Sequence, residues 1–316
     1  MLIPQERLLP FLICPVTGNP LKKKSGGDMP AEYCDSSDTY TYQKTGGKPV
    51  LVNFETSLLD VEQLLVSEGQ SLVPRQNEGG VLAKLKTTVN RPSKATTANV
   101  ATLLHQCNGC ESSARVLLIG GGTVGYGMSP FFSREDIDLV SFDIYASPTV
   151  QLIADAHDLP FKSGTFDIVI IQAVLEHVLE PTRVVAEIHR VLSDDGIVYA
   201  ETPFMQQVHE GAYDFTRFSE RGHRYLFRYF DQLYSGPTAG PGTAMIWSIE
   251  HLFRGLFRSR LIGKLARLFF FWLQYLDDIV GKDFSEDAAS AVYFMGKKSN
   301  QATSPKETIA GYTGAQ

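Results

Sequence analysis

The feature that most constrains this chain is an apolar run that enters a glycine-rich turn. Residues 115–119 read Arg-Val-Leu-Leu-Ile, and residues 120–127 carry five glycines. A second apolar run, 139–142, ends at Asp143. In an open parallel sheet such glycines allow a tight turn, and the N–H groups after it face a bound nucleotide. The carboxylate can accept both ribose hydroxyls, so the stretch predicts a nucleotide site at a sheet edge.

The chain that follows alternates strand-like and helix-like segments. Residues 151–155 end at a carboxylate, and 166–172 form the nearly continuous apolar run that is typical of a strand buried on both faces. Apolar residues then recur at helical spacing over 181–192, before another strand at 197–201. This alternation predicts an α/β fold with a parallel, doubly wound sheet.

Composition narrows the class of protein. The chain has 316 residues, of which 43% are hydrophobic, enough for one large domain with an appendage or for two modest domains. A net charge of −6 gives no electrostatic reason to expect nucleic acid as a partner. Charges and a proline interrupt the N-terminus, and no apolar run reaches membrane-span length. Four cysteines are consistent with free thiols, and we expect a cytoplasmic protein.

Residues 8–53 have the short strands and turns of a small separate module. Cys14 and Cys34 are each followed three residues later by a residue other than cysteine, namely Thr17 and Ser37. The segment resembles the zinc-ribbon-like module of the Trm112 type, whose pattern carries two C-x-x-C pairs. A structural zinc site needs four ligands, so the resemblance implies a degenerate, metal-free module.

An intact C-x-x-C pair lies at Cys107 and Cys110, just before the first sheet strand. The pair can complete a four-cysteine site with Cys14 and Cys34, or it can be two unrelated thiols at a helix end. We favour the second interpretation and expect no metal site in the chain.

The ordered motifs together resemble a class I S-adenosylmethionine-dependent methyltransferase of the type 11 group. In chain order, these motifs are the glycine turn, Asp143, and Asp155 followed by Leu-Pro-Phe at 159–161. Phe-Asp-Ile-Val at 166–169 and Leu-Glu-His-Val at 175–178 come next. The resemblance implies a Rossmann-like, mostly parallel seven-stranded sheet with an antiparallel last strand. It also implies a methyltransferase domain at 93–298, after the module at 1–54. The residue pattern adds a helical linker at 55–92, a helical insertion at about 240–285 and a polar tail at 299–316 that we expect to be disordered.

The resemblance assigns S-adenosyl-L-methionine to the sheet edge. Asp143 would hold the ribose hydroxyls, and Asp155 with the Ala156 N–H would bind the adenine; a helix cap or turn is the alternative for either carboxylate. Leu118 stands where many family members have an acidic residue, so the methionyl end must be held differently. The expected cofactor-binding residues are Gly120, Gly121, Gly122, Gly125, Asp143, Ile144, Asp155, Ala156, Gln172 and Ala173.

The acceptor side is expected after the fifth strand, where polar residues gather. Methyl transfer from a sulfonium mainly needs alignment, and a base is needed only when the acceptor must lose a proton. Candidate bases are His209, Asp214 and His177. Candidate acceptor-binding residues are Gln206, Gln207, Tyr213 and Arg217.

The insertion before the last strand combines apolar and aromatic residues at helical spacing with basic side chains. Residues 245–280 are therefore expected to roof the acceptor pocket or to form a homodimer or partner face. Peripheral contact with a membrane surface is a less favoured alternative.

Three functional hypotheses remain at this stage. The first is an enzyme that methylates an O or N atom of a small or medium-sized acceptor. The second is a non-catalytic, methyltransferase-like partner or scaffold protein. The third is an NAD(P)-binding oxidoreductase, which shares the glycine turn and Asp143 but does not predict the later motifs.

Overall fold

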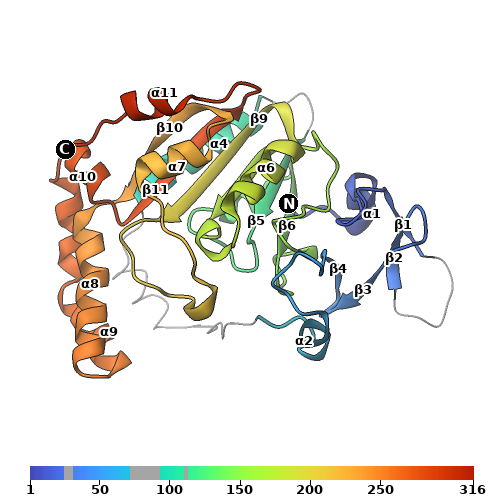
Figure 1. Cartoon of the computed structure of the whole chain (residues 1–316), viewed down its shortest axis with the longest axis horizontal. Helices are drawn as coiled ribbons and strands as arrows, with labels where there is room; N and C mark the ends of the chain where they lie inside the picture. The colour runs from blue at the N-terminus through green and yellow to red at the C-terminus, as the bar shows by residue number, and fades with distance from the viewer. Residues whose placement is uncertain (25–30, 72–92, 110–112) are drawn as a thin grey trace.

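A computed structural model describes residues 1–24, 31–71, 93–109 and 113–316. Within these ranges, eleven strands form one sheet with helices on both faces (Figure 1). The strands, in sheet order, are β1 (Leu21–Lys23), β2 (Ala31–Asp35), β3 (Thr41–Thr45), β4 (Lys48–Leu51), β7 (Leu152–Ala154), β6 (Ile137–Asp143), β5 (Ala114–Ile119), β8 (Phe166–Gln172), β9 (Leu192–Pro203), β11 (Ala291–Lys298) and β10 (Phe230–Ala239).

The centre of the sheet is parallel, as the alternation of strands and helices predicted. Strands β7, β6, β5, β8 and β9 all run in one direction. The last strand, β11, is antiparallel to both β9 and β10, which confirms the predicted reversal. The carboxyl ends of the parallel strands therefore meet at one edge, where an open α/β sheet binds its ligands.

The predicted count of seven strands is wrong, because the N-terminal strands extend the same sheet. Strand β4 pairs in parallel with β7, with Val50 opposite Ile153. Strands β1 to β3 then add antiparallel neighbours beyond β4 (Figure 1). The local sequence pattern predicted these short strands. It could not predict that β4 would pair with β7, because that pairing joins segments far apart in the sequence.

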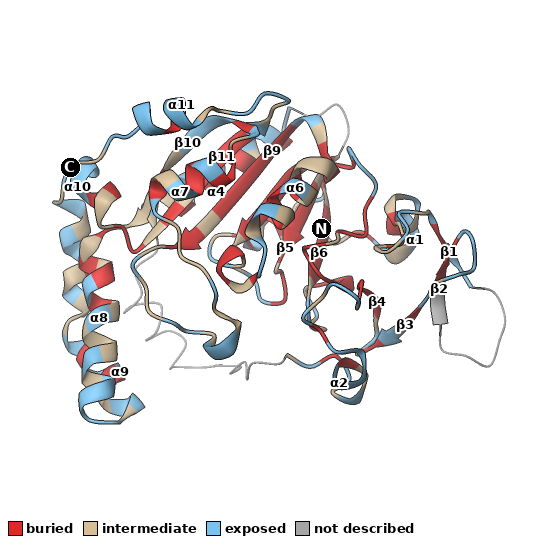
Figure 2. Cartoon of the chain, viewed as in Figure 1, coloured by how far each residue is buried: buried red, intermediate tan, exposed pale blue. Residues whose placement is uncertain are grey.

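The central strands are largely buried (Figure 2). Their alternate residues contribute to two hydrophobic cores, one on each face of the sheet. Helix α4 (Lys94–Cys107), which Ser93 caps, and α5 (Ser129–Ser133) cover one face. Helices α6 (Pro181–Val191) and α7 (Glu220–Leu226) cover the other. Leu118, in place of the family's acidic residue, packs into the first of these cores.

The insertion forms α8 (Pro241–Leu256), α9 (Arg260–Phe269), the 3₁₀ segment η4 (Phe271–Asp278) and α10 (Lys282–Asp287). These helices lie at the end of the sheet opposite to the N-terminal strands (Figure 1). Several large apolar side chains stay exposed on them, among them Leu261, Leu265 and Phe269. None of the helices described has the length and apolar character needed to cross a membrane.

Two regions outside the sheet bear on the predicted boundaries. The sequence predicted a disordered tail at 299–316, but the structure has a helix there. This helix, α11 (Pro305–Ala310), begins with a capping box between Ser304 and Glu307. Ahead of β5, the helical segments α1 (Gln5–Leu8), η1 (Leu9–Phe11) and α2 (Val61–Val66) are short. The rest of the expected linker, 72–92, and Cys110 lie outside the described residues.

Candidate functional site

A cavity of about 570 Å³ lies at the carboxyl edge of the parallel strands. The turns after β5, β6, β7, β8 and β9 line it, together with Leu58, Leu59 and Ser71 from the N-terminal segment. The predicted residues on its wall are Gly120, Gly125, Asp143, Ile144, Asp155, Ala156, Gln172, Ala173, His177, Gln206, His209 and Tyr213. The predicted residues that do not line it are Gly121, Gly122, Gln207, Asp214 and Arg217.

The glycine turn is shaped by a close approach to its neighbours. Gly120 has φ +76°, and a Cβ there would overlap the Val174 side chain. Gly122 donates its N–H to Asp143 Oδ2 at 2.8 Å, and a Cβ at Gly122 would come within 2.6 Å of the same oxygen. Glycine is therefore required for Asp143 to reach the turn. Asp143 Oδ1 accepts the Ile144 N–H at 2.7 Å. A carboxylate at this place on the cavity wall can accept hydrogen bonds from the hydroxyl groups of a ligand.

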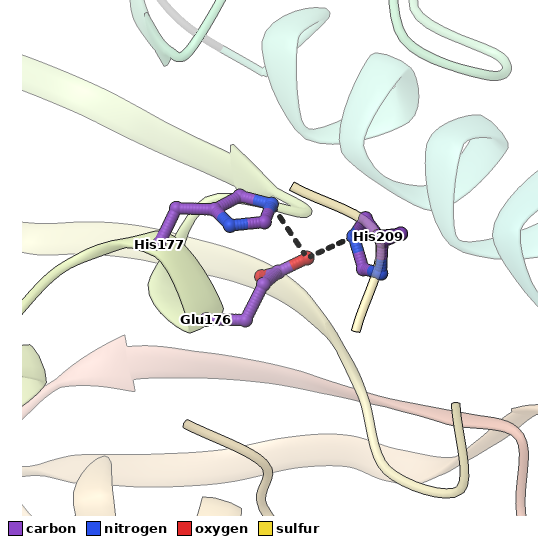
Figure 3. Close-up of side chains that lie close together, drawn as sticks. All are labelled: Glu176, His177 and His209. Atoms are coloured by element: carbon purple, nitrogen blue, oxygen red, sulfur yellow. Dashed lines mark ion pairs between the residues drawn. The ribbon is translucent and has the colours of Figure 1, made fainter. Parts of the chain in front are cut away.

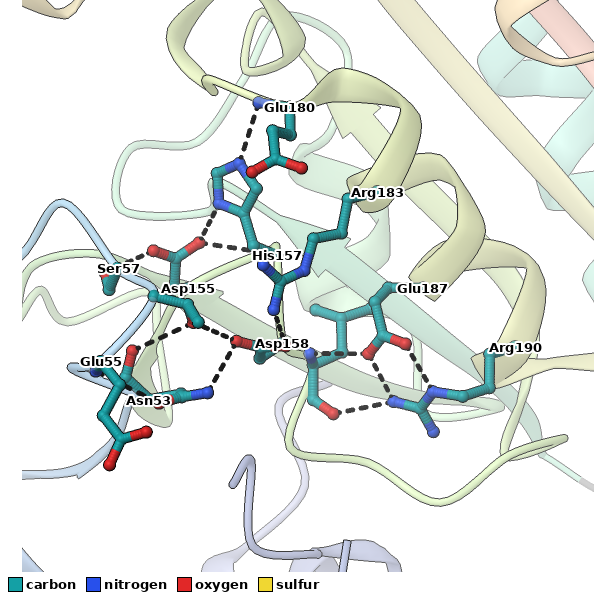
Figure 4. A network of polar contacts seen from close by, with 12 residues as sticks. Asn53, Glu55, Ser57, Asp155, His157, Asp158, Glu180, Arg183, Glu187 and Arg190 are labelled. Atoms are coloured by element: carbon teal, nitrogen blue, oxygen red, sulfur yellow. Dashed lines mark hydrogen bonds and ion pairs between the residues drawn. The ribbon is translucent and has the colours of Figure 1, made fainter. Parts of the chain in front are cut away.

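Asp155 is buried at the cavity wall and joins the sheet to the N-terminal segment (Figure 4). Its Oδ1 accepts hydrogen bonds from the His157 backbone at 2.9 Å and from His157 Nδ1 at 2.6 Å, and its Oδ2 accepts from the Ser57 hydroxyl. Burial raises the pKa of Asp155, but these hydrogen bonds outweigh burial and lower the pKa below its usual value. The carboxylate thus stays ionised, and Oδ2 keeps a lone pair for a ligand.

A second carboxylate, Asp158, holds the same segment in place (Figure 4). Its Oδ2 accepts from Asn53 Nδ2 at 3.1 Å and from Thr56 Oγ1 at 2.6 Å. Its Oδ1 pairs with Arg183 of α6 at 2.5 Å. Residues 53–57 are therefore fixed against the turn after β7, which brings the following Leu58 and Leu59 to the cavity wall.

The end of β8 carries backbone strain at the cavity. Ala173 has φ +53°, a region that costs a non-glycine residue about 1 kcal/mol or more and that is concentrated at functional sites. Beside it, Gln172 Nε2 donates to Glu201 Oε2 at 2.7 Å. The buried Gln172 Oε1 has no hydrogen-bond partner among the described residues. Gln172 and Glu201 thus present polar atoms to the cavity from adjacent strand ends.

The opposite wall brings Glu176, His177 and His209 together (Figure 3). Glu176 and His177 belong to η2 (Leu175–His177), and His209 lies on the long loop after β9. Nε2 of His177 is 3.7 Å and Nε2 of His209 is 3.9 Å from Glu176 Oε1. Burial raises the pKa of Glu176 to about 8 and lowers the pKa of His177.

The loop after β9 is held by an ion pair beneath its surface. The Asp214 carboxylate, which is 1% exposed, binds Arg217 through both oxygens and accepts the His209 backbone N–H at 2.8 Å. Burial acts to raise the pKa of Asp214, but Arg217 and the His209 N–H hold it well below its usual range. Arg217 also donates to the Gln206 carbonyl at 3.0 Å. Asp214 and Arg217 thus fix the loop from behind the cavity wall.

The insertion touches the same loop. The ring centroids of His209 and Trp247 of α8 are 6.0 Å apart. Gln207 Nε2 donates to Ser248 Oγ, also of α8, at 3.1 Å. The first helix of the insertion therefore packs against the loop beside the cavity.

Some residues of the site were not expected from the sequence: Glu176 and Glu201 line the cavity, and Ser57 donates to Asp155. Ser57 belongs to a segment interpreted as a linker, and nothing local ties it to Asp155. Glu176 is part of the Leu-Glu-His-Val motif, which could have indicated it. Glu201 ends the fifth strand on a carboxylate, the same signal that identified Asp143.

Comparison with known proteins found a match to one protein family and a short match to one curated protein. Residues 132–200 match a family described as a methyltransferase domain, which covers the segment from α5 to β9. The human protein named arginine-hydroxylase NDUFAF5, mitochondrial, is 42% identical over 50 residues. That match covers 16% of this chain and only 14% of the relative.

Among solved structures, two examples are an S-adenosylmethionine-dependent methyltransferase from Archaeoglobus fulgidus and a 1,6-didemethyltoxoflavin N1-methyltransferase from Burkholderia thailandensis. The first has a TM-score of 0.42 at 13% identity, with 69% of this chain and 100% of that chain covered. The second has a TM-score of 0.40 at 13% identity, with 69% and 84% covered. At these scores neither likeness carries an argument about function.

Proposed function

We propose that the chain transfers a methyl group to an O or N atom of a small or medium-sized acceptor. The premise is that it contains a methyltransferase domain of the class I, S-adenosylmethionine-dependent type. The observation that carries this proposal is the two-sided cavity. Asp143 and Asp155 stand on one side, and Glu176, His177 and His209 stand on the other. A cofactor bound along the first side would direct its methyl group toward the second.

The cofactor side is supported by hydrogen-bonding capacity. Asp143 lies on the cavity wall, where a carboxylate can accept hydrogen bonds from ribose hydroxyls, and Asp155 Oδ2 retains a lone pair for the adenine amino group. Leu118 is buried in a core, so Glu201 and Gln172 are the polar groups proposed to contact the methionyl end. An NAD(P)-dependent oxidoreductase would use the same turn, but the matched family favours the adenosyl cofactor.

The acceptor side is proposed to lie between η2, the loop after β9 and α8. An in-line displacement needs the acceptor held to within about 1 Å. Residues from all three elements meet there through His177, His209 and Trp247. The first helix of the insertion is therefore proposed to support the wall that aligns the acceptor.

Calorimetric titration with S-adenosylmethionine, S-adenosylhomocysteine and NAD tests the proposal. We expect saturable binding of the first two, at one site per chain, and no binding of NAD. Incubation with methyl-labelled cofactor and a panel of hydroxyl and amine acceptors should then label a product. Cofactor binding without transfer to any acceptor would support the non-catalytic alternative, and binding of NAD alone would refute the proposal.

Ser57 provides a milder test of the cofactor side. Ser57→Ala removes the hydroxyl that donates to Asp155, and a hydrogen bond to a charged group contributes about 1.5–3 kcal/mol. Only part of that loss reaches the ligand, so we expect S-adenosylmethionine to bind about three- to tenfold more weakly. Ser67→Ala, on α2's C-terminal side and away from the cavity, is the control. Equal affinity in both variants would show that residues 53–57 do not support the site.

A further inference from the structure

We propose that Glu176, His177 and His209 bind a divalent transition-metal ion on the acceptor wall of the cavity. One oxygen of Glu176 and one ring nitrogen of each histidine lie within 4.8 Å of one another. Two nitrogens and a carboxylate oxygen form a donor set that suits zinc, iron(II) and neighbouring ions of the first transition row. This departs from the sequence analysis, which expected no metal site.

The spacing is close to what one ion requires. Ligands at about 2.0–2.1 Å from a tetrahedral ion are about 3.3–3.4 Å apart. The two histidine nitrogens are 3.7 Å and 3.9 Å from Glu176 Oε1, too far for hydrogen bonds and only slightly too far for a shared ion. Side-chain movements of less than about 1 Å would bring all three atoms onto one ion.

The other ring nitrogen of each histidine is already used. His177 Nδ1 is 2.7 Å from the Tyr213 carbonyl, so it must be the protonated nitrogen that donates. His209 Nδ1 is 3.2 Å from the Gln207 carbonyl and 3.5 Å from Asp214 Oδ2. Both rings therefore direct an Nε2 lone pair toward Glu176, and such outer hydrogen bonds are how proteins orient metal-ligating histidines.

The surroundings of the Glu176 side chain also favour a bound cation. Its side chain is 1% exposed, and neither carboxylate oxygen has a hydrogen-bond partner among the described residues. A buried acceptor without a donor is costly, and two histidine lone pairs facing it add repulsion. A cation between the three groups would convert these unfavourable contacts into bonds, whereas no donor among residues 1–24, 31–71, 93–109 and 113–316 does so.

The three ligands come from one wall of the cavity, so an ion there keeps coordination positions for another ligand. This step rests on the proposed function: the added ligand is an oxygen of the acceptor. A divalent ion lowers the pKa of a bound hydroxyl, so the ion would favour acceptors that carry an ionisable hydroxyl. Metal binding itself does not depend on methyl transfer and is measured without cofactor.

Titration of the chelator-treated 316-residue chain with Zn²⁺ and with Co²⁺ tests the site. We expect one ion per chain by calorimetry, and a visible Co²⁺ absorption band typical of low coordination. Glu176→Gln and His209→Ala should each raise the dissociation constant at least tenfold, since losing even an outer hydrogen bond costs about 10–100-fold. His177→Ala gives a third variant in case one of these fails to fold.

Two controls separate this site from others. His105→Ala removes an exposed histidine of α4 that does not line the cavity, and it should bind the ion like the parent protein. A Cys14→Ser and Cys34→Ser double variant should also bind it unchanged, which distinguishes the proposed ligands from the N-terminal thiols. The proposal is overturned if the parent protein binds no ion saturably, or if only the cysteine variant loses the ion. Methyl transfer that persists without metal would leave the binding result standing and would refute only the acceptor role.

Discussion

Asp143→Ala is expected to weaken the binding of S-adenosylmethionine by at least tenfold. Asp143 lies at the end of β6 on the cavity wall, and each of its oxygens already accepts one backbone N–H, from Gly122 and from Ile144. A ribose would add two hydroxyl hydrogen bonds to the carboxylate, each worth about 1.5–3 kcal/mol. Alanine removes both and also frees the glycine turn.

The experiment needs a variant that separates ligand binding from folding. Asp138→Ala changes a carboxylate on the same strand that pairs with exposed Arg7 and does not line the cavity. We expect it to keep the parent dissociation constant, because such surface pairs contribute about 0–1 kcal/mol. Asp143→Asn keeps the shape and one acceptor and should fall between the parent and Asp143→Ala. A parent-like constant in a folded Asp143→Ala protein would remove Asp143 from the site.

The sequence predicted the sheet and its edge because that information is local. A strand followed by glycines, or a strand that ends on a carboxylate, places a residue at the carboxyl edge whatever the rest of the chain does. Asp143 and Asp155 were found in this way, whereas Gln172 and Ala173 were assigned from the family resemblance, and all four line the cavity. The antiparallel last strand came from the family resemblance and not from spacing.

What the sequence could not predict depends on contacts between distant segments. The pairing of β4 with β7 and the hydrogen bond from Ser57 to Asp155 join residues about a hundred positions apart. Asp214 was expected to act as a base, but its side chain turns away from the cavity to bind Arg217. A carboxylate whose pKa is lowered by a guanidinium is a weak base, so positioning of the loop fits its surroundings better.

The convergence of Glu176, His177 and His209 was likewise hidden. Adjacent residues 176 and 177 appeared as one motif, and His209 appeared as a lone histidine in a polar loop. Their meeting depends on the path of the loop, which the Phe215 and Thr216 N–H groups tie to the Glu176 carbonyl at 2.8 Å and 3.2 Å. Once these contacts are known, His209 becomes the residue on which most of the acceptor chemistry is expected to depend.

His209→Ala is expected to lower turnover by about 10²–10⁴-fold and to leave the affinity for S-adenosylmethionine within about twofold of the parent. Its ring is part of the acceptor wall, on the side of the cavity opposite to Asp143 and Asp155. A general base and a metal ligand at this position both predict the loss of turnover. They differ in the response to chelation, since a metal ligand predicts that chelator-treated parent protein also loses activity and regains it with added metal.

Three variants sharpen this test once an acceptor is known. His105→Ala should turn over like the parent, because it removes a histidine outside the cavity. Asp214→Asn should reduce turnover less than His209→Ala, since it loosens the Arg217 contact and the His209 backbone but leaves the imidazole in place. Glu176→Gln should match His209→Ala if both hold one ion, and it should have a smaller effect if His209 acts alone as a base. Parent-like turnover in His209→Ala would move the chemistry to His177, whose Nε2 faces the same oxygen of Glu176.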